Sequence, residues 1–320
     1  MKRNDLSKYI DILSDFGWKF YFGREENKGN LINFLNSLLE GEHVVIDLQY
    51  SNVEEDGDEP SERKVVFDLR CVGASGEVFL VEMQLQNQDF FFDRAVSYTS
   101  RTISRLAKKG KEGNNYELPP IYFVAVLGFR LDISNREKYY YSAKIMDEFD
   151  QEVLYPKLSY KLLVLPNFNK SKNDLPTIMD QWMYLMKHLD EIDELPNYLD
   201  KRIFSRIFEV GELAKLTPDE QMSYISSIDR KRDYINTLAY AKKEGRLEGE
   251  KHGRLEGEKH GRLEGEKHGR TEAEAKAYAE NLASARKMLA RGIEKDEISE
   301  ILELSIEELR RTLRSKIEKL

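Results

Sequence analysis

The amino-acid sequence predicts an α/β protein: a core of strands and helices, followed by an all-helical C-terminal region. Three observations support this fold class. Two β-rich runs flank the turn residues Gly-Ala-Ser-Gly at 73–76, which predicts a hairpin. Residues 121–127 form a wholly apolar run of the kind found in buried strands. From Asn167 onward almost every segment has helical periodicity.

The composition is that of a folded protein without membrane spans. The chain has 320 residues, 40% of them hydrophobic and 11% aromatic, enough for a sizeable core and roughly two domains. No apolar run approaches the roughly 18 residues of a membrane helix, and we expect no signal peptide at the N-terminus. A single cysteine, Cys71, excludes a disulfide framework and favours a reducing, cytoplasmic location.

The charge balance bears on nucleic-acid binding. Lys and Arg total 50 and Asp and Glu 58, a formal net charge of −8. This balance counts against a generally basic nucleic-acid binder and leaves open a binder with one local basic face. Residues 241–320 contain 19 basic and 18 acidic residues, so they are not a basic DNA-binding tail.

The elements of the first half follow from periodicity and turn signals. Apolar residues recur at helical spacing over 31–39, and Gly41 closes that helix. Residues 43–50 are expected to form a strand, and the acidic, turn-rich stretch 54–62 a surface loop. The hairpin follows, then an amphipathic helix over about 90–109, the buried strand 121–127 and a short strand near 161–165.

The second half is expected to be helical. Residues 174–189 predict a helix with Pro176 near its start, whose larger apolar side chains pack in a core: Trp182, Met183, Leu185, Met186 and Leu189. Two or three further helices are expected up to about residue 243. Short helices near the C-terminus are expected to break at Gly292 and to be capped at Ser305, with protein contact favoured over DNA reading.

The octapeptide GRLEGEKH occurs three times in succession over residues 245–268. Eight residues advance a helix by about 80° beyond two turns, so the repeated leucines form no continuous seam. Glu250–Arg254 and Glu258–Arg262 are expected to pair, while glycine at every fourth position opposes the helix. We therefore predict a solvated helical spacer. The expected division is 1–166 core, 167–243 helical region, 244–276 repeat and 277–320 short helical segment.

The hairpin carries the candidate site. With the turn centred between Ala74 and Ser75, Asp68 lies opposite Val81 or Glu82, and Glu82 and Gln84 share one face of their strand. Two carboxylates this close repel each other unless a cation lies between them, and Mg²⁺ suits such a pair. The alternative is a solvent-facing hairpin without function. The apolar neighbours of both acids favour burial, and hence the metal site.

A basic stripe is expected on the helix after the hairpin. It is the face made by Arg94, Tyr98, Arg101, Arg105 and Lys108, and the sheet-facing side is expected to be Val96, Thr99, Ile103, Leu106 and Ala107. Such a stripe suits contact with the phosphate backbone, and Lys109 and Lys111 would extend it. A charged face that merely contacts solvent is the alternative.

Several stretches resemble the Rpn family of recombination-promoting nucleases, also described as the PD-(D/E)XK nuclease family transposases. The resemblance covers about residues 15–130 closely and the helical tail more loosely. The matching stretches are Phe22-Gly-Arg-Glu-Glu-Asn-Lys, Leu31-Ile-Asn-Phe-Leu-Asn, Val66-Phe-Asp-Leu, Val81-Glu-Met-Gln and Phe92-Asp-Arg-Ala-Val-Ser-Tyr.

The resemblance implies a restriction-endonuclease-like (PD-(D/E)XK) α/β core with a mixed central sheet flanked by helices. It also implies Mg²⁺-dependent DNA cleavage, with Mn²⁺ as the alternative ion. It implies that Asp68 and Glu82 hold the metal, that Gln84 replaces the lysine usual in the wider superfamily, and that Arg94 and Tyr98 match a recurrent pattern near the site. Some members of the superfamily place an additional acid where Glu25 and Glu26 lie; the alternative is that these acids are simply favoured by the helix dipole in a first helical turn. The alternative function is a catalytically weak nuclease-like module that binds DNA or protein. The C-terminal helices would then join a partner or a second copy.

Overall fold

The computed structural model describes residues 7–55, 65–87, 89–108, 117–133 and 137–314 of the chain. The chain divides into two compact units, residues 1–234 and 235–320. The first unit contains the sheet and the helices that cover it, and the second is helical. Within the described residues, no helix combines the length and the apolar character that crossing a membrane requires.

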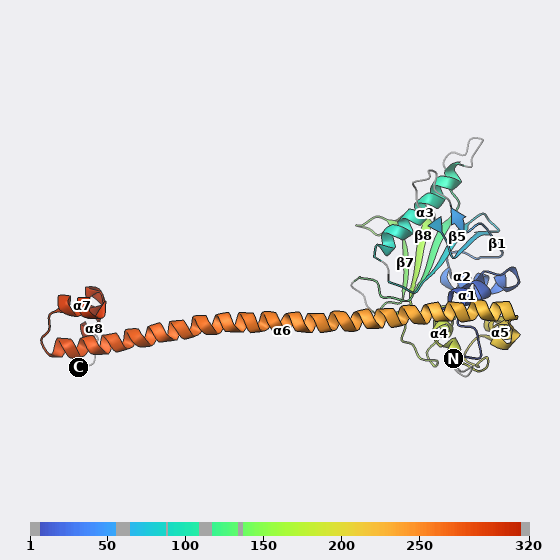
Figure 1. Cartoon of the computed structure of the whole chain (residues 1–320). Coiled ribbons are helices and arrows are strands. Elements are labelled where there is room, and N and C mark those ends of the chain that lie inside the picture. The colour runs from blue at the N-terminus through green and yellow to red at the C-terminus, as the bar shows by residue number, and fades with distance from the viewer. Residues whose placement is uncertain (1–6, 56–64, 88, 109–116, 134–136, 315–320) are drawn as a thin grey trace. The chain divides into compact units, whose positions relative to one another are not determined.

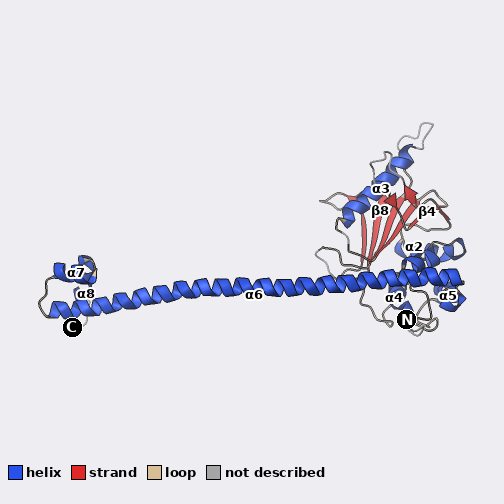
Figure 2. Cartoon of the chain, in the orientation of Figure 1, coloured by secondary structure: helices blue, strands red, loops and turns tan. Residues whose placement is uncertain are grey.

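A mixed six-stranded sheet forms the centre of the first unit (Figure 2). The three central strands are parallel, and the remaining strands are antiparallel to their neighbours. A separate short ladder pairs β2 (Glu54–Glu55) with β3 (Val65–Val66). In spatial order the sheet consists of β1 (Leu48–Tyr50), β4 (Leu69–Gly73), β5 (Val78–Gln84), β6 (Ile121–Leu127), β8 (Val153–Val164) and β7 (Tyr140–Met146).

Four short helices form the larger core with one face of the sheet: α1 (Asp15–Phe22), α2 (Lys28–Leu38), α4 (Ile178–His188) and α5 (Lys201–Val210). Tyr224 and Ile228, near the start of α6 (Pro218–Ala290), belong to the same core. Aromatic rings join the helices to one another, as where Phe22 and Trp182 lie 5.5 Å apart between ring centroids. The residues predicted as core between 182 and 189 are all buried, so that prediction is confirmed. Short 3-10 turns connect the elements at Glu25–Asn27, Leu165–Asn167, Leu189–Glu191 and Leu213–Lys215.

Helix α3 (Phe91–Lys108) packs on the opposite face of the sheet (Figure 1). The small residues Ala95, Thr99 and Thr102 are its most buried positions, and the Thr99 hydroxyl lies 2.7 Å from the Tyr160 hydroxyl of β8. The expected sheet-facing side was therefore partly wrong, since Val96 and Ala107 are exposed. Small side chains let the helix approach the sheet closely, so the face that carries them is the buried one, and Val96 lies outside it.

The predicted hairpin is confirmed, and the strand predicted before it is shorter than expected. The Gly73 N–H donates to the Glu77 carbonyl at 2.8 Å, and Gly76 adopts φ +86°, which suits glycine. Before the hairpin, the backbone of Val45 bonds the Asn36 side chain, donating at 2.7 Å and accepting at 3.0 Å. Because these groups are occupied by a side chain, ladder pairing begins only at Leu48.

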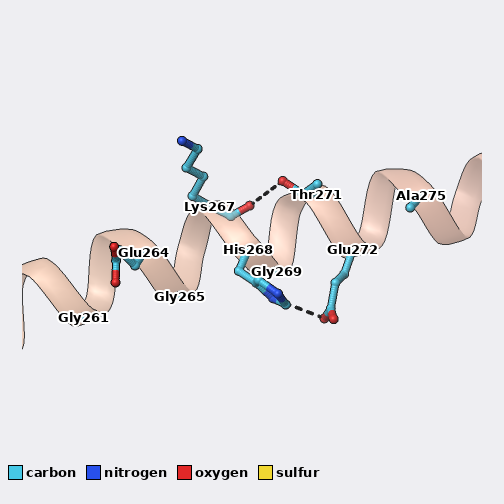
Figure 3. Close-up of a pocket in the computed structure, with 9 residues that line it drawn as sticks. All are labelled: Gly261, Glu264, Gly265, Lys267, His268, Gly269, Thr271, Glu272 and Ala275. Carbon is cyan, nitrogen blue, oxygen red and sulfur yellow. Dashed lines mark hydrogen bonds and ion pairs between the residues drawn. The ribbon is translucent and has the colours of Figure 1, made fainter.

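Helix α6 (Pro218–Ala290) contains the octapeptide repeat, whose side chains are exposed. Ion pairs along it join a basic residue to the glutamate four positions later, as between Arg246 and Glu250 at 3.1 Å. Figure 3 shows a stretch of this helix with the His268–Glu272 pair. The pairs run opposite to the predicted direction, because Arg254 contacts Glu258. Arginine N-terminal to glutamate is the less favourable order for a helix.

The C-terminal helices α7 (Lys295–Leu302) and α8 (Ile306–Arg314) form a small core with the end of α6. That core consists of Ala285, Ile298, Leu304 and Leu309. Gly292, with φ +83°, follows α6, and the Ser305 hydroxyl accepts from the Glu308 N–H at 3.3 Å. The predicted helix break at Gly292 and the predicted helix cap at Ser305 are both confirmed.

Replacing the repeat glycines Gly249, Gly257 and Gly265 with alanine should stabilise this helix. A Cβ at these positions meets nothing within 4 Å, and alanine in a helix is favoured over glycine by about 1 kcal/mol per site. The melting temperature of the helical signal in far-ultraviolet circular dichroism should therefore rise. Gly292→Ala is the matched control and should lower it, because an alanine is strained at positive φ. Unchanged melting in the triple variant would contradict a solvated helix.

Candidate active site

Asp68 and Glu82 face each other across the hairpin formed by β4 and β5. Leu69 pairs with Val81, which sets Asp68, in the bend just before β4, opposite Glu82. The Met83 N–H donates to Asp68 Oδ2 at 2.7 Å, and the Asp68 N–H lies 3.4 Å from Glu82 Oε1. Backbone hydrogen bonds thus hold the two carboxylates together, as the expected register required.

The two carboxylates are removed from water. Glu82 is 5% exposed, and Asp68 is half-buried. Burial and, second, the neighbouring Asp68 carboxylate raise the pKa of Glu82 to about 8. Burial also raises the pKa of Asp68 above its ordinary value. Without a cation, the site therefore holds a proton near neutral pH.

Arg94 from α3 joins Glu82 to Gln84. Its guanidinium lies 3.6 Å from Glu82 Oε2 and donates to Gln84 Oε1 at 3.3 Å. The Gln84 amide also donates to the Gln86 carbonyl at 3.0 Å. The same guanidinium lies over the Tyr98 ring at 5.1 Å. Three of the predicted site residues therefore meet around one arginine.

The rest of the predicted basic stripe lies on the same helix. Tyr98 packs edge-on against Phe67 at 5.3 Å between ring centroids, and Arg101 and Arg105 are half-buried further along α3. The side chain of Lys108 and all of Lys109 and Lys111 lie outside the described residues. The structure thus brings Arg94 and Tyr98 to the carboxylates, while Arg101 and Arg105 lie beyond them on the helix.

Two charged residues of α1 also act on the site. Lys19 favours and Asp15 opposes ionisation of Asp68, and the two pair with each other at 2.8 Å. Nothing in the sequence indicated their proximity, because 49 positions separate Lys19 from Asp68. Glu25 and Glu26 are largely exposed in a 3-10 turn before α2, where Glu25 pairs with Lys28 and Glu26 with Arg24.

Comparison with protein families identifies this arrangement. The family model described as PD-(D/E)XK nuclease family transposase matches residues 12–241, more than half of the chain and all of the site. The chain belongs to this family. No curated protein and no solved structure gives a significant match. The predicted restriction-endonuclease-like fold is confirmed, since the mixed sheet with flanking helices agrees with the PD-(D/E)XK match.

PD-(D/E)XK nucleases typically use divalent metal ions, and the chemistry of this site fits one. Two adjacent carboxylates whose pKa values are raised by burial gain from a cation that relieves their repulsion. Among the described ranges, no group of three or more His, Cys, Asp or Glu side chains could hold a metal. The protein donors at the site would be the Asp68 and Glu82 carboxylates, and Mg²⁺ accepts one or two carboxylates with several waters.

Proposed function

We propose that the chain is a metal-dependent DNA endonuclease that hydrolyses phosphodiester bonds in recombination or at mobile elements. The convergence of Asp68 and Glu82 within a PD-(D/E)XK family carries this proposal. Mg²⁺ is the proposed cofactor, with Mn²⁺ as the alternative. A cytoplasmic location is supported by the single cysteine.

The residues around the carboxylates have separate proposed roles. Asp68 and Glu82 would hold the divalent ion, which when bound supplies Lewis-acid chemistry to a phosphate and a water. Gln84, fixed by Arg94, would orient the attacking water or the scissile phosphate through its amide. Arg94 would offset negative charge at the reacting phosphate, and Tyr98 would hydrogen-bond it. Arg101 and Arg105 would neutralise phosphates further along the strand.

Gln84 also favours a second candidate function. A lysine carries a positive charge that can stabilise developing negative charge, whereas a glutamine is neutral and can only orient a water or phosphate by hydrogen bonding. Slow cleavage is therefore expected. The alternative is a catalytically weak nuclease-like module that binds DNA or protein, with partners or a second copy joined through residues 277–320.

A plasmid assay separates the two functions. Purified full-length chain is incubated with supercoiled plasmid and Mg²⁺ or Mn²⁺, with chelator, Asp68→Ala and Glu82→Ala as controls. Nicking that needs the metal and is lost in both variants supports the endonuclease. Equal nicking by wild type and both variants would exclude it, and binding without cutting would support the module.

Replacing Arg94 with alanine together with Tyr98 with phenylalanine should weaken DNA cutting by about thirtyfold. Hydrogen bonds to a charged group contribute about 2 kcal/mol, and a total loss of that size corresponds to about thirtyfold in rate. The phenylalanine keeps the ring that packs on Phe67, so the circular dichroism melting curve should remain cooperative. Arg206→Ala, which removes an exposed arginine of α5, is the control and should cut like wild type. Wild-type cutting in the double variant would remove α3 from the mechanism.

The proposed division into 1–166, 167–243, 244–276 and 277–320 assigns cleavage to the first part and spacing to the repeat. Removing one octapeptide should then leave plasmid nicking within about twofold of wild type, because the repeat side chains are exposed and the proposal gives them no role in cleavage. A large loss of nicking would contradict the spacer role.

A further inference from the structure

A hollow of about 440 Å³ lies beyond the carboxyl ends of β5 and β6. It is lined by the residues that follow these two strands, 87 and 89–93 on one side and 129–132 on the other. The Gly128 N–H donates to the Gln84 carbonyl at 2.9 Å, and a Cβ on Gly128 would lie 2.8 Å from the Leu85 Cα. The two loops are in contact where β5 ends, so the hollow lies at the same end of β5 as Gln84. Its volume is typical of small-molecule sites.

The hollow is rich in phenylalanine, and two of its rings are left in water. Phe90 is 77% exposed and Phe92 is 49% exposed, whereas Phe91 lies between Phe92 and Phe129 at ring centroid distances of 5.5 and 5.8 Å. Phe90 also has φ +64°, a backbone conformation that side chains of this size rarely adopt. An exposed aromatic held in a strained backbone adds nothing to the core, and such strain is typical of functional sites.

Phe90 is connected to the candidate site through α3. Its carbonyl accepts from the Arg94 N–H at 3.0 Å, and the Arg94 side chain contacts Glu82 and Gln84. Phe90 lies one helical turn before Arg94, so a DNA strand held by Arg94 would pass close to the Phe90 ring. This continuity with the basic stripe favours DNA as the occupant.

The charges of the hollow select a base and not a phosphate. Asp89, Asp93 and Asp132 line it and would repel a phosphate. Among the described residues that line it, the arginine is Arg130, which donates to Asn167 at 3.1 Å and to the Pro166 carbonyl at 3.4 Å. Aromatic faces stack on bases, and carboxylates accept hydrogen bonds from the exocyclic amino groups of cytosine, adenine and guanine.

We propose that this aromatic hollow receives an unstacked base of the bound strand next to the scissile phosphate. The preferred substrate class is then DNA with unpaired bases beside the cleavage point. This inference rests on the proposed nuclease function and adds the kind of DNA that the site selects.

The test compares the binding of three labelled oligonucleotides: a single strand, a duplex with a one-base bulge and a fully paired duplex. The host is the full-length chain carrying Asp68→Asn, so that no cutting disturbs the equilibrium. The unpaired probes should bind at least about tenfold more tightly than the paired duplex, as base stacking on aromatic side chains commonly provides. Phe90→Ala with Phe92→Ala should reduce the ratio of the affinity for unpaired probes to that for the paired duplex to about threefold or less.

Two further variants control for folding and for general exposure. Phe90→Gly removes the ring and relieves the positive φ, so it should lower the ratio while raising the melting temperature. Phe149→Ala removes a 95% exposed ring in the β7–β8 turn and should leave the ratio unchanged. Equal binding of the three probes by the host, or a ratio that survives loss of both rings, would overturn the inference.

Plasmid cutting by the wild-type chain is scored separately, so the two proposals can fail independently. Cutting of plasmid without preference for unpaired DNA would overturn only the proposal that the aromatic hollow receives a base. Preference without cutting would support the hollow and exclude the endonuclease. Absence of both binding and cutting would overturn both.

Discussion

Binding of one divalent ion to the wild-type chain at pH 7 should release about nine-tenths of a proton, and Glu82→Gln should lose both the binding and the release. The pKa of Glu82 is raised to about 8, first by burial and then by Asp68, so most chains hold a proton there at pH 7. A carboxylate must be ionised to bind a metal ion, so binding displaces that proton. At pH 9 the release should fall to about one-tenth of a proton.

Calorimetric titration of Mn²⁺ in two buffers of different ionisation enthalpy measures this release. Glu42→Gln is a suitable control because Glu42 contacts Lys144 and Lys161 instead of the site, and its variant should bind the ion as wild type does. Undiminished binding by Glu82→Gln, or no proton release at pH 7, would contradict a shared site at Asp68 and Glu82.

Glu82→Gln should also stabilise the metal-free protein, by up to about 5 kcal/mol above pH 8. The folded chain holds the Glu82 proton more tightly than the unfolded chain, whose pKa is near the ordinary 4.5. Stability contributed by this group is therefore present below pH 4.5 and declines as the pH rises towards about 8. Each unit of pKa difference corresponds to about 1.4 kcal/mol, and glutamine has no charge to bury.

The same substitution at Glu42 should act in the opposite direction. Burial alone would raise the pKa of Glu42, but hydrogen bonds from Lys144 and Lys161 outweigh it and lower the pKa. Glu42→Gln should thus destabilise the protein at pH 7, because the buried Lys161 ammonium would lose the negative charge of its ion-pair partner. Urea unfolding in chelator from pH 5 to 9 tests both variants. A Glu82→Gln variant that is less stable than wild type at pH 8.5 would contradict the buried, repelling pair.

Much of the fold and the main acidic pair could be predicted because they depend on local pattern. The residues at 73–76 specify a turn, and the turn sets the register that brings Asp68 opposite Glu82. The apolar run at 121–127 admits few alternatives to a buried strand. The position of Gln84 on the same face of β5 as Glu82 follows from the alternation of side chains along the strand.

The parts that were missed depend on packing between distant segments. The aromatic run in α1 has little helical signal of its own, yet Trp18 and Phe22 are buried against α2 and α4. Edge strand β7 was not predicted, because few of its side chains are buried. The contact of Arg94 with Glu82 depends on which face of α3 packs on the sheet. That face is the one with the small residues Ala95, Thr99 and Thr102.

Phe90 illustrates the same limit at a single position. The sequence shows three consecutive phenylalanines, and nothing in it distinguishes the one that is held at positive φ in water from the one packed between its neighbours. Which ring faces the hollow depends on the two loops after β5 and β6, which are 37 or more residues apart along the chain. Backbone conformation in such loops is set by tertiary contacts.

The rates of plasmid nicking by wild type, Asp68→Asn, Glu82→Gln and the double variant, at equal protein and saturating Mg²⁺, test the proposed active site most directly. If the two carboxylates act as one unit, each single variant should lose about a thousandfold in rate or more. The double variant should then lose no more than either single variant. Nicking by either single variant within tenfold of the wild-type rate would contradict cleavage at this site.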